Sequence, residues 1–445
     1  MSDGITSASA PDLTGDVLTR NLAEFAAPRG RDLLGRTAGF MEWADARRTA
    51  GLWPYNRSLD SPPGPEARTF DEEGRALPGR NFGSQDYLSL GPHPAVRAAL
   101  LRALDDFGPH SASSGILQGN TRLSRDLERR LAEFLELENV MLFPTGWAAG
   151  FGSISGLVRQ YDYIVLDKLA HACLQAGAYS ATSRVLRNEH NDVGSVRARL
   201  EEIRRDDADA AVLVVTEGLF SLDSDSPSIE VLQEACSEFE ATLMVDVAHD
   251  LGALGPAGTG RIGIEGMLGK VDLVMGSFSK TFASNGGFLA SNRRSAIDFV
   301  RAFGNTGTFS NALSPTQAAV VTAALEIVRS PEGDRLREDL MRAVHAIRDA
   351  FSKCEIECLG APSAIVIVPV GDEAVARVAG RLLVGRGVLV NVFEFPAVSI
   401  GSARFRLQMM AAHTEADVRD AASVVSQAVR DARSTLDRGS GDARS

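Results

Sequence analysis

The chain has 445 residues, of which 44% are hydrophobic, and a formal net charge of −12. Its length allows two or three domains around a large core, and its acidic balance argues against a nucleic acid or an anionic membrane surface as a partner. No apolar run is long enough to span a membrane, and residues 1–14 lack the charged start and apolar stretch of a signal peptide, so we expect a cytoplasmic protein. The four cysteines suit a reduced compartment, and we predict no metal site because Cys354 and Cys358 lack a second Cys or His pair at metal-ligand spacing.

Residues 1–80 are predicted to form an N-terminal arm and a linker. Residues 1 to about 30 are weakly patterned, as is typical of a mobile end, whereas residues 31–52 have the apolar spacing of one or two short amphipathic helices. Ser61-Pro62-Pro63-Gly64-Pro65 has the composition of a linker. A loose tail and an arm lying on the main body both fit this pattern. We favour the arm because Trp43 and Trp53 lie in it.

Residues 81–329 are predicted to form a large α/β domain. A strand and turn at 81–90 and helices at about 95–107 and 122–137 come first, and apolar runs then alternate with helical stretches. Runs that are apolar throughout predict strands buried on both faces, hence a mainly parallel central sheet with helices on both faces. The predicted strands are Val140–Phe143, Tyr163–Leu166, Ala211–Val215, Thr242–Val245 and Leu273–Met275, and the helices between them include Trp147–Val158, Val196–Arg204 and Ile229–Glu238.

Residues 330–436 are predicted to form a smaller C-terminal α+β domain, because helical stretches flank short apolar runs. Residues 437–445 are polar and are expected to form a disordered tail. The expected helices are Arg335–Phe351, Glu373–Gly385 and Glu415–Leu436, and the expected strands are Ser363–Val370, Val388–Val392 and Phe405–Met409.

A lysine follows the apolar strand Leu273–Met275, at the end of Gly276-Ser277-Phe278-Ser279-Lys280. Desolvating an ammonium is costly unless it is paired or chemically used, and burial lowers the lysine pKa and prepares a nucleophile for a Schiff base. A surface lysine at a strand end explains this stretch equally well on its own. However, Asp246 ends the preceding strand 34 residues earlier. A carboxylate paired with such a lysine is what a pyridoxal phosphate site needs.

Two histidines and a glycine turn complete the set of strand-end residues. His171 and His249 each follow a predicted strand, although one such histidine alone would more often be a hydrogen-bonded core residue. Gly146 opens a helix directly after the strand Val140–Phe143, and the exposed amides at a helix start suit a phosphate. Two histidines, one aspartate and one lysine on successive strand ends are hard to explain by packing.

Seven segments together resemble the α-oxoamine synthase family of fold-type I PLP-dependent transferases. The resemblance runs from about Asn81 to Val425, and its most specific pieces are NFGSQDYLSL, DKLAHACL, VVTEGLFSLDSDS, VDVAHDLG, GSFSKTF, TFSNALSP and RFRLQMMAAHT. It implies pyridoxal 5'-phosphate as the cofactor. The implied activity is the decarboxylative condensation of a small amino acid with an acyl thioester, carried on coenzyme A or on an acyl carrier protein, to give an α-amino ketone, CO2 and the free thiol.

The resemblance implies which residues handle the cofactor ring. Lys280 would hold the cofactor covalently and remove the Cα proton of the amino acid. Asp246 would pair with the pyridine nitrogen, and His171 would stack on the ring face. His249 and Ser221 would hydrogen-bond the phenolic oxygen of the ring.

The phosphate and the second subunit involve another set of residues. Gly146 and Trp147 would hold the phosphate through their backbone amides, together with Ser277. Ser310 and Asn311 would reach the phosphate of the neighbouring subunit. The resemblance therefore implies a homodimer with its active sites at the interface.

Substrate recognition is expected at three further positions. Arg406 would grip the amino-acid carboxylate, with Arg404 as the less favoured choice, and Gln85 lies in a loop that would touch the substrate. The turn Thr281–Asn285 departs from the glycine-rich turn usual in the family, so it is a candidate for specificity.

Other functions are also compatible with the sequence. An aminotransferase or a lyase on the same scaffold would use Lys280 and Asp246 without an acyl thioester, and a non-catalytic partner subunit is a third possibility. A nicotinamide-binding fold lacks support, because no G-x-G-x-x-G follows the first strand. The arginine-rich helix that starts near Arg122 is either a surface for an acidic carrier protein or a solvated face.

Overall fold

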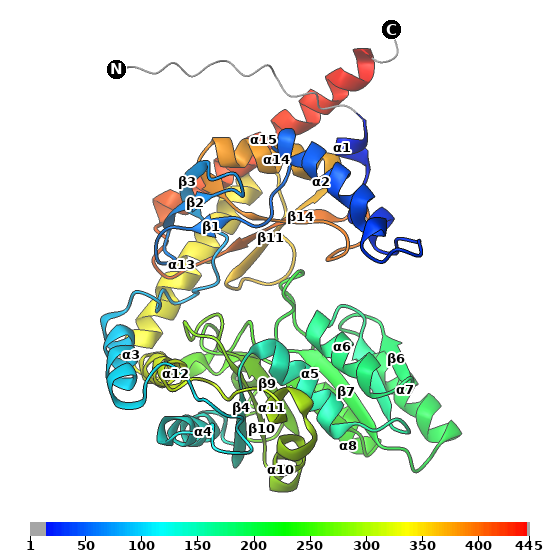
Figure 1. The fold of residues 1–445 in the computed structure, drawn as a ribbon, viewed down its shortest axis with the longest axis vertical. Coiled ribbons are helices and arrows are strands. Elements are labelled where there is room, and N and C mark those ends of the chain that lie inside the picture. Colours follow the sequence, from blue (N-terminus) through cyan, green and yellow to red (C-terminus); the bar gives the residue numbers. More distant parts are fainter. Residues whose placement is uncertain (1–14, 443–445) are drawn as a thin grey trace.

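The computed structural model describes residues 15–442, with a large α/β part that carries a smaller α+β part at one end (Figure 1). Seven strands form the sheet of the large part, in the order β4-β10-β9-β8-β7-β5-β6. The pairs among β5 to β9 are parallel, whereas β10 is antiparallel to both β4 and β9. The strands are β4 (Asn139–Phe143), β5 (Tyr163–Asp167), β6 (Val185–Asn188), β7 (Val212–Glu217), β8 (Thr242–Asp246), β9 (Leu273–Ser277) and β10 (Gly287–Ser291). The predicted α/β class with a mainly parallel sheet is thereby confirmed.

Helices cover both faces of this sheet. Ile164 of β5 shares a hydrophobic core with Ile154 and Leu174, whereas the next residue, Val165, belongs to a second core with Leu200. Successive side chains on a strand point to opposite faces, so the two cores lie on opposite sides of the sheet. The covering helices include α5 (Gly146–Leu157), α6 (Ala172–Ala181), α7 (Val193–Asp206), α8 (Ile229–Glu238) and α10 (Arg294–Phe303).

The smaller part is built around the three-stranded antiparallel sheet β11-β14-β13. The long helix α13 runs from the large part into this smaller part (Figure 1). The C-terminal elements are α12 (Pro315–Val328), α13 (Pro331–Lys353), β11 (Ile365–Gly371), α14 (Glu373–Gly385), β12 (Val388–Leu389), β13 (Asn391–Phe393), β14 (Ala403–Gln408) and α15 (Glu415–Asp442). The single predicted strand at 388–392 is divided between β12 and β13, which belong to different sheets.

The N-terminal segment joins the smaller part. Three of its strands form a four-stranded sheet with β12 in the order β1-β2-β3-β12, so the proline-rich stretch at 61–65 connects two paired strands. Arg47 is fully buried, and its Nη1 lies 3.0 Å from Oε1 of Glu394. The side chain of Arg377 binds the other oxygen of Glu394. The N-terminal elements are α1 (Asp16–Thr19), α2 (Ala38–Thr49), β1 (Ser58–Leu59), β2 (Glu66–Phe70) and β3 (Ala76–Asn81).

The remaining helices lie in the large part. The helices are α3 (Pro94–Phe107), α4 (Arg122–Leu135), α9 (Gly260–Ile264) and α11 (Asn305–Thr308). α15 continues to Asp442, past the predicted start of a disordered tail at residue 437, and residues 1–14 and 443–445 lie outside the described residues. Within residues 15–442, no helix is long and apolar enough to cross a membrane.

Candidate active site

The carboxyl ends of the central strands surround a cavity of about 230 Å³. Parallel strands end at the same edge of the sheet, which brings residues from distant stretches of the sequence together. Seven of the predicted site residues line the cavity, namely Gly146, Trp147, His171, Asp246, His249, Ser277 and Lys280. Asn285, from the turn predicted as a candidate for specificity, lines it as well, as do residues to which the sequence assigned no role, such as Thr145, Cys173, Glu217 and Ser279.

One wall of the cavity is the start of helix α5. The Thr145 side chain caps this helix by accepting a hydrogen bond from the amide of Ala148 at 3.0 Å. A Cβ on Gly146 would lie only 2.4 Å from the Ser277 Oγ, so only glycine allows the helix start to approach this hydroxyl. The remaining amides of the first turn and two serine hydroxyls, with Ser277 Oγ 2.8 Å from Ser279 Oγ, therefore form a cradle that could bind an anion.

Lys280 lies beside two carboxylates at the ends of neighbouring strands. Glu217 of β7 and Asp246 of β8 are paired in register. The pKa of Lys280 is lowered chiefly by desolvation, against the attraction of these two carboxylates. Burial raises the pKa of Asp246 to about 6, against the pull of the Lys280 ammonium. Burial also raises the pKa of Glu217 well above its usual range, and the charge of Asp246 adds to that shift.

The two cavity histidines are neutral. The pKa of His171 is lowered to about 4 by desolvation and by the positive charges of Lys280 and Arg406. His171 caps helix α6, where its Nδ1 accepts from the amide of Cys173 at 3.2 Å, so its proton lies on Nε2. Burial likewise lowers the pKa of His249 well below its usual range, and its Nδ1 lies 2.8 Å from the hydroxyl of Tyr87.

Arg406 of β14 belongs to the smaller part and is not among the residues that line the cavity, but its positive charge acts on His171, His249 and Lys280. Its guanidinium is buried, lies 4.4 Å from the centre of the Phe393 ring and donates from Nη1 to the carbonyl of Ser221 at 3.3 Å. With the amide of Gln408 oriented so that its oxygen faces Arg406, that oxygen accepts from Nε at 2.7 Å and from Nη2 at 3.1 Å. The amide nitrogen of Gln408 then donates to the Tyr87 hydroxyl at 3.2 Å. A chain of hydrogen bonds thus connects Arg406 with His249.

Arg404 lies on the same strand in different surroundings. Its Nη1 donates to the carbonyl of Leu222 and to Oδ1 of Asp223, both at 2.7 Å. These contacts hold the loop that follows β7 in place, so the Arg404 guanidinium stabilises that loop.

The other predicted residues, like the two arginines, are not part of the cavity wall. Ser221 belongs to the loop after β7 and meets Arg406 through its carbonyl. Gln85 lines an adjoining cleft of about 720 Å³, whose wall also includes Lys280. The Ser310 hydroxyl donates to the carbonyl of Thr306, and Asn311 forms an isolated bridge with Ser114. The structure therefore does not bring Ser310 and Asn311 to the cavity of their own chain.

Three residues that contact the site residues were not predicted from the sequence. Glu217 offered a signal, because it ends a buried strand just as Asp246 does. Tyr87 and Gln408 offered none, since each is an ordinary residue whose partner lies far away in the sequence.

Comparisons with known proteins give a consistent result. Residues 79–425 match the family model described as aminotransferase class I and II. The chain is 33% identical to the 8-amino-7-oxononanoate synthase of Geotalea daltonii, over 88% of this chain and 98% of that relative. It is also 33% identical to the 8-amino-7-oxononanoate synthase of Marinobacter nauticus, over 85% of this chain and 93% of the relative. Among solved structures, a serine palmitoyltransferase from S. paucimobilis with a bound PLP–myriocin aldimine superposes with a TM-score of 0.84 at 27% identity, over 90% of this chain and 99% of the other.

Proposed function

Because this chain belongs to the aminotransferase class I and II family and is an α-oxoamine synthase within it, we propose that it condenses a small amino acid with an acyl thioester and releases CO2, with pyridoxal phosphate as its cofactor. The observation that carries this proposal is the meeting of Lys280, Asp246 and two neutral histidines around one cavity beside an anion-binding cradle.

The residues present fit pyridoxal phosphate. The cradle at Gly146 and Ser277 suits the phosphate, and its close approach exists only because residue 146 has no Cβ. Asp246 is suited to pair with a protonated pyridine nitrogen of the cofactor. Lys280, with its lowered pKa, is suited to form a covalent bond with the carbonyl carbon of the cofactor. When bound, the cofactor supplies an electron-withdrawing ring that stabilises negative charge at the Cα atom of the amino acid.

Glu217 and Asp246 are expected to differ in protonation, which gives the two carboxyl groups different roles. Two negative charges on adjacent buried strand ends repel each other, so one carboxyl stays protonated near neutral pH. We assign that proton to Glu217, whose pKa is raised by burial and by the charge of Asp246, and the anion to Asp246, which the Lys280 ammonium stabilises. The neutral Glu217 still accepts a hydrogen bond from the amide of His171, which fixes that histidine at the cavity wall.

A chain of hydrogen bonds orients His249. The amide nitrogen of Gln408 donates to the Tyr87 oxygen, so the hydroxyl of Tyr87 donates onward to Nδ1 of His249. The proton of this neutral ring then lies on Nε2, which makes Nε2 a donor for a phenolic oxygen in the cavity. At the other end of the chain, Arg406 presents a guanidinium suited to the amino-acid carboxylate.

Lys280 is placed to move the Cα proton. Its lowered pKa makes the neutral amine accessible, and a neutral Nζ can accept a proton from Cα once the amino acid is held by Arg406.

The adjoining cleft suits the acyl thioester. It opens beside Lys280, and much of its wall is apolar, with contributions from Leu59, Pro62, Pro63, Leu100, Ala283 and Val320. The turn that departs from the family pattern contributes Ala283, Ser284 and Asn285, in agreement with a role in specificity. The arginines of α4 pair with acidic neighbours, since Arg125 binds Glu128 and Arg129 binds Asp126. This pairing favours a solvated helix face over a docking surface for a carrier protein.

The active unit is proposed to be a homodimer. Ser310 and Asn311 do not reach the cavity of their own chain, which leaves them available to a second copy. Phe309, next to them, is 83% exposed, and Leu117 on the neighbouring loop is 74% exposed. Large apolar side chains on adjacent segments are typical of a surface that a partner covers.

The proposal is tested with a matrix of amino acids and thioesters. Glycine, alanine and serine are each incubated with short and long acyl-CoA and acyl-carrier-protein thioesters, and CO2 release and ketone formation are measured. We expect one pairing to release CO2 and thiol in equal amounts. Conversion of the amino acid by a keto acid, without CO2 release from any pairing, would establish an aminotransferase instead.

A further inference from the structure

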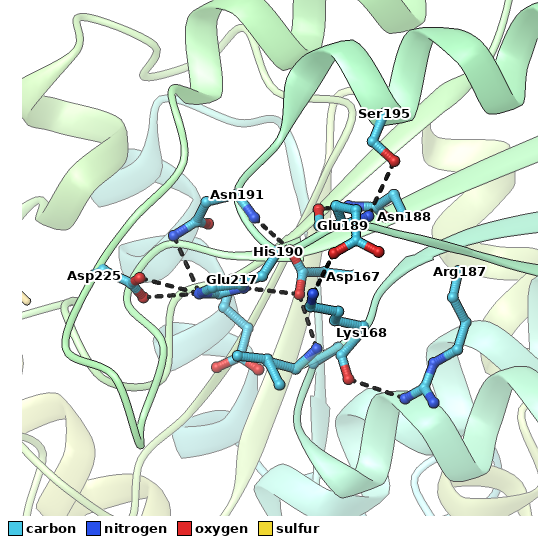
Figure 2. Close-up of polar contacts among 12 residues, drawn as sticks. Asp167, Lys168, Arg187, Asn188, Glu189, His190, Asn191, Ser195, Glu217 and Asp225 are labelled. Atoms are coloured by element: carbon cyan, nitrogen blue, oxygen red, sulfur yellow. Dashed lines mark hydrogen bonds and ion pairs between the residues drawn. The ribbon is translucent and has the colours of Figure 1, made fainter. Parts of the chain in front are cut away.

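A second group of charged residues surrounds His190, near the carboxyl ends of β5 and β6 (Figure 2), and neither His190 nor Asp167 nor Asp225 lines the cavity. His190 follows β6, and both nitrogens of its ring meet carboxylates. Nδ1 lies 2.9 Å from Oδ1 of Asp167, and Nε2 lies 3.0 Å from Oδ2 of Asp225. The edge of the ring also packs against Phe220, with ring centres 4.5 Å apart and planes at 90°.

Of these two carboxylates, Asp167 is fixed to the sheet. It is the last residue of β5, and it accepts hydrogen bonds from the amides of Leu169 and Asn191, both at 2.9 Å. Asp225 lies instead on residues 218–226, which form most of the loop between β7 and α8. Through Asp225 and the packing of Phe220, His190 holds this loop to the end of the central sheet.

The other side of the same loop carries the smaller part. The carbonyls of Leu222 and Ser221 accept from Arg404 and Arg406, and Ser224 donates to the carbonyl of Ile365 at 2.9 Å. The loop therefore lies between His190 on one side and the strands β11 and β14 on the other. Any shift of Ser221 displaces a hydrogen-bond acceptor of the Arg406 guanidinium.

We propose that His190 is a positioning residue for substrate binding: by joining Asp167 to Asp225 it holds the loop 218–226 in place, and through the Ser221 carbonyl it sets the position of Arg406. This inference rests on the proposed function, in which Arg406 receives the amino-acid carboxylate.

The charge of His190 strengthens this connection. Burial opposes a charge on the ring, but the hydrogen bonds to Asp167 and Asp225 outweigh that cost and raise the pKa of His190 to about 10. A doubly bonded imidazolium is therefore present at neutral pH, and charge-assisted hydrogen bonds are about twice as strong as neutral ones.

The test compares amino-acid binding by the cofactor-loaded wild type, His190→Gln and Asp225→Asn, followed through the absorbance of the cofactor. Asp225→Asn removes the same charged contact at a partly exposed site, so it remains informative if His190→Gln folds poorly. Lys168→Gln is the matched control, because it removes the Lys168–Glu189 ion pair beside His190 without touching the loop. We expect His190→Gln and Asp225→Asn each to weaken amino-acid binding about tenfold. Lys168→Gln should leave amino-acid binding unchanged.

A double-mutant cycle separates positioning from general stability. In an Arg406→Lys background the loop no longer has a guanidinium to position, so His190→Gln should weaken binding there by less than about twofold. Equal factors in both backgrounds, or unchanged binding in the first, would overturn the proposal. Hydrogen exchange of the amides of residues 218–226 should quicken in His190→Gln without cofactor. This readout is independent of CO2 release, so a failure of the proposed function is distinguishable from a failure of this inference.

Discussion

The Lys280 cavity and the His190 cluster are built from histidines and carboxylates at the same edge of one parallel sheet, yet their charges behave in opposite ways. In the cavity, burial without full pairing lowers the pKa of His171 to about 4 and raises that of Asp246 to about 6. In the cluster, two carboxylates on one ring raise the pKa of His190 to about 10. Pairing with opposite charges, more than position on the sheet, therefore decides whether a group at a strand end can exchange protons near neutral pH or keeps its charge.

The largest effect is expected in the cavity, from Lys280→Ala. The variant loses both the covalent attachment and the proton acceptor, so the rate of CO2 release should fall by about 10³-fold or more. The absorption band that arises from the bond between the lysine and the cofactor should also disappear. Lys270→Ala is the control, because Lys270 lies in the turn before β9 and donates to the carbonyl of Gly266. Similar losses in both variants would remove Lys280 from the proposed site.

The next largest effects should distinguish the two arginines of β14, Arg404 and Arg406. Arg406→Lys should raise the KM for the amino acid by about ten- to hundredfold, because an ammonium cannot reproduce the two-pronged guanidinium contact. Arg404→Lys should instead lower the free energy of unfolding, since Arg404 pairs with Asp223, and should change this KM much less. Steady-state kinetics and urea unfolding of both variants check the assignment. A larger rise in KM for Arg404→Lys would exchange their roles.

The fixed charge of His190 predicts a particular dependence of stability on pH. Because its pKa is raised in the folded protein, its stabilising contribution is complete below about pH 6.5 and is lost as the pH rises through about 10. The difference in free energy of unfolding between wild type and His190→Gln should therefore be largest near pH 6 and should shrink toward pH 10. The charged groups that contact the ring are Asp167 and Asp225, and the Lys168–Glu189 ion pair lies nearby in the chain. Urea unfolding at several pH values provides the measurement, and a constant difference would contradict a charged ring.

The smallest effect is expected from Glu217→Gln. If Glu217 is protonated, the amide replaces it at nearly equal size and equal charge and still accepts from the amide of His171. Activity should then fall by less than about tenfold, and the free energy of unfolding should change by less than about 1 kcal/mol. A loss as large as that of Lys280→Ala would show that the cavity needs a second negative charge.

The sequence predicted the central sheet well because its strands are short, apolar throughout and separated by helices. Strand β6 was missed because Val185 and Leu186 are only half-buried at the edge of the sheet, and β10 was missed because it begins within a glycine pair. The strands between residues 58 and 81 were missed because their stability depends on partners far away in the sequence. For such strands, local pattern carries little information.

The cavity was predictable for a similar reason. Its main residues follow strand ends directly, so topology alone brings Lys280, Asp246 and His249 together. The sequence could not show that Gln408 and Tyr87 connect Arg406 with His249, since that chain depends on the docking of two parts. Nor could it show that His190 lies between two carboxylates, one of which arrives on a loop 35 residues later.

The parallel pairing of β3 with β12 has a consequence for the order in which the molecule forms. Arg80 and Asn81 pair with Val388 and Leu389, about 300 residues later in the chain. During synthesis from the N-terminus, the hairpin of β2 and β3 emerges early and must wait with one open edge until nearly the whole chain has left the ribosome. The seven-stranded sheet has by then received all of its strands, so it can assemble first. The N-terminal strands and the smaller part should therefore close last, on a catalytic sheet that is already in place.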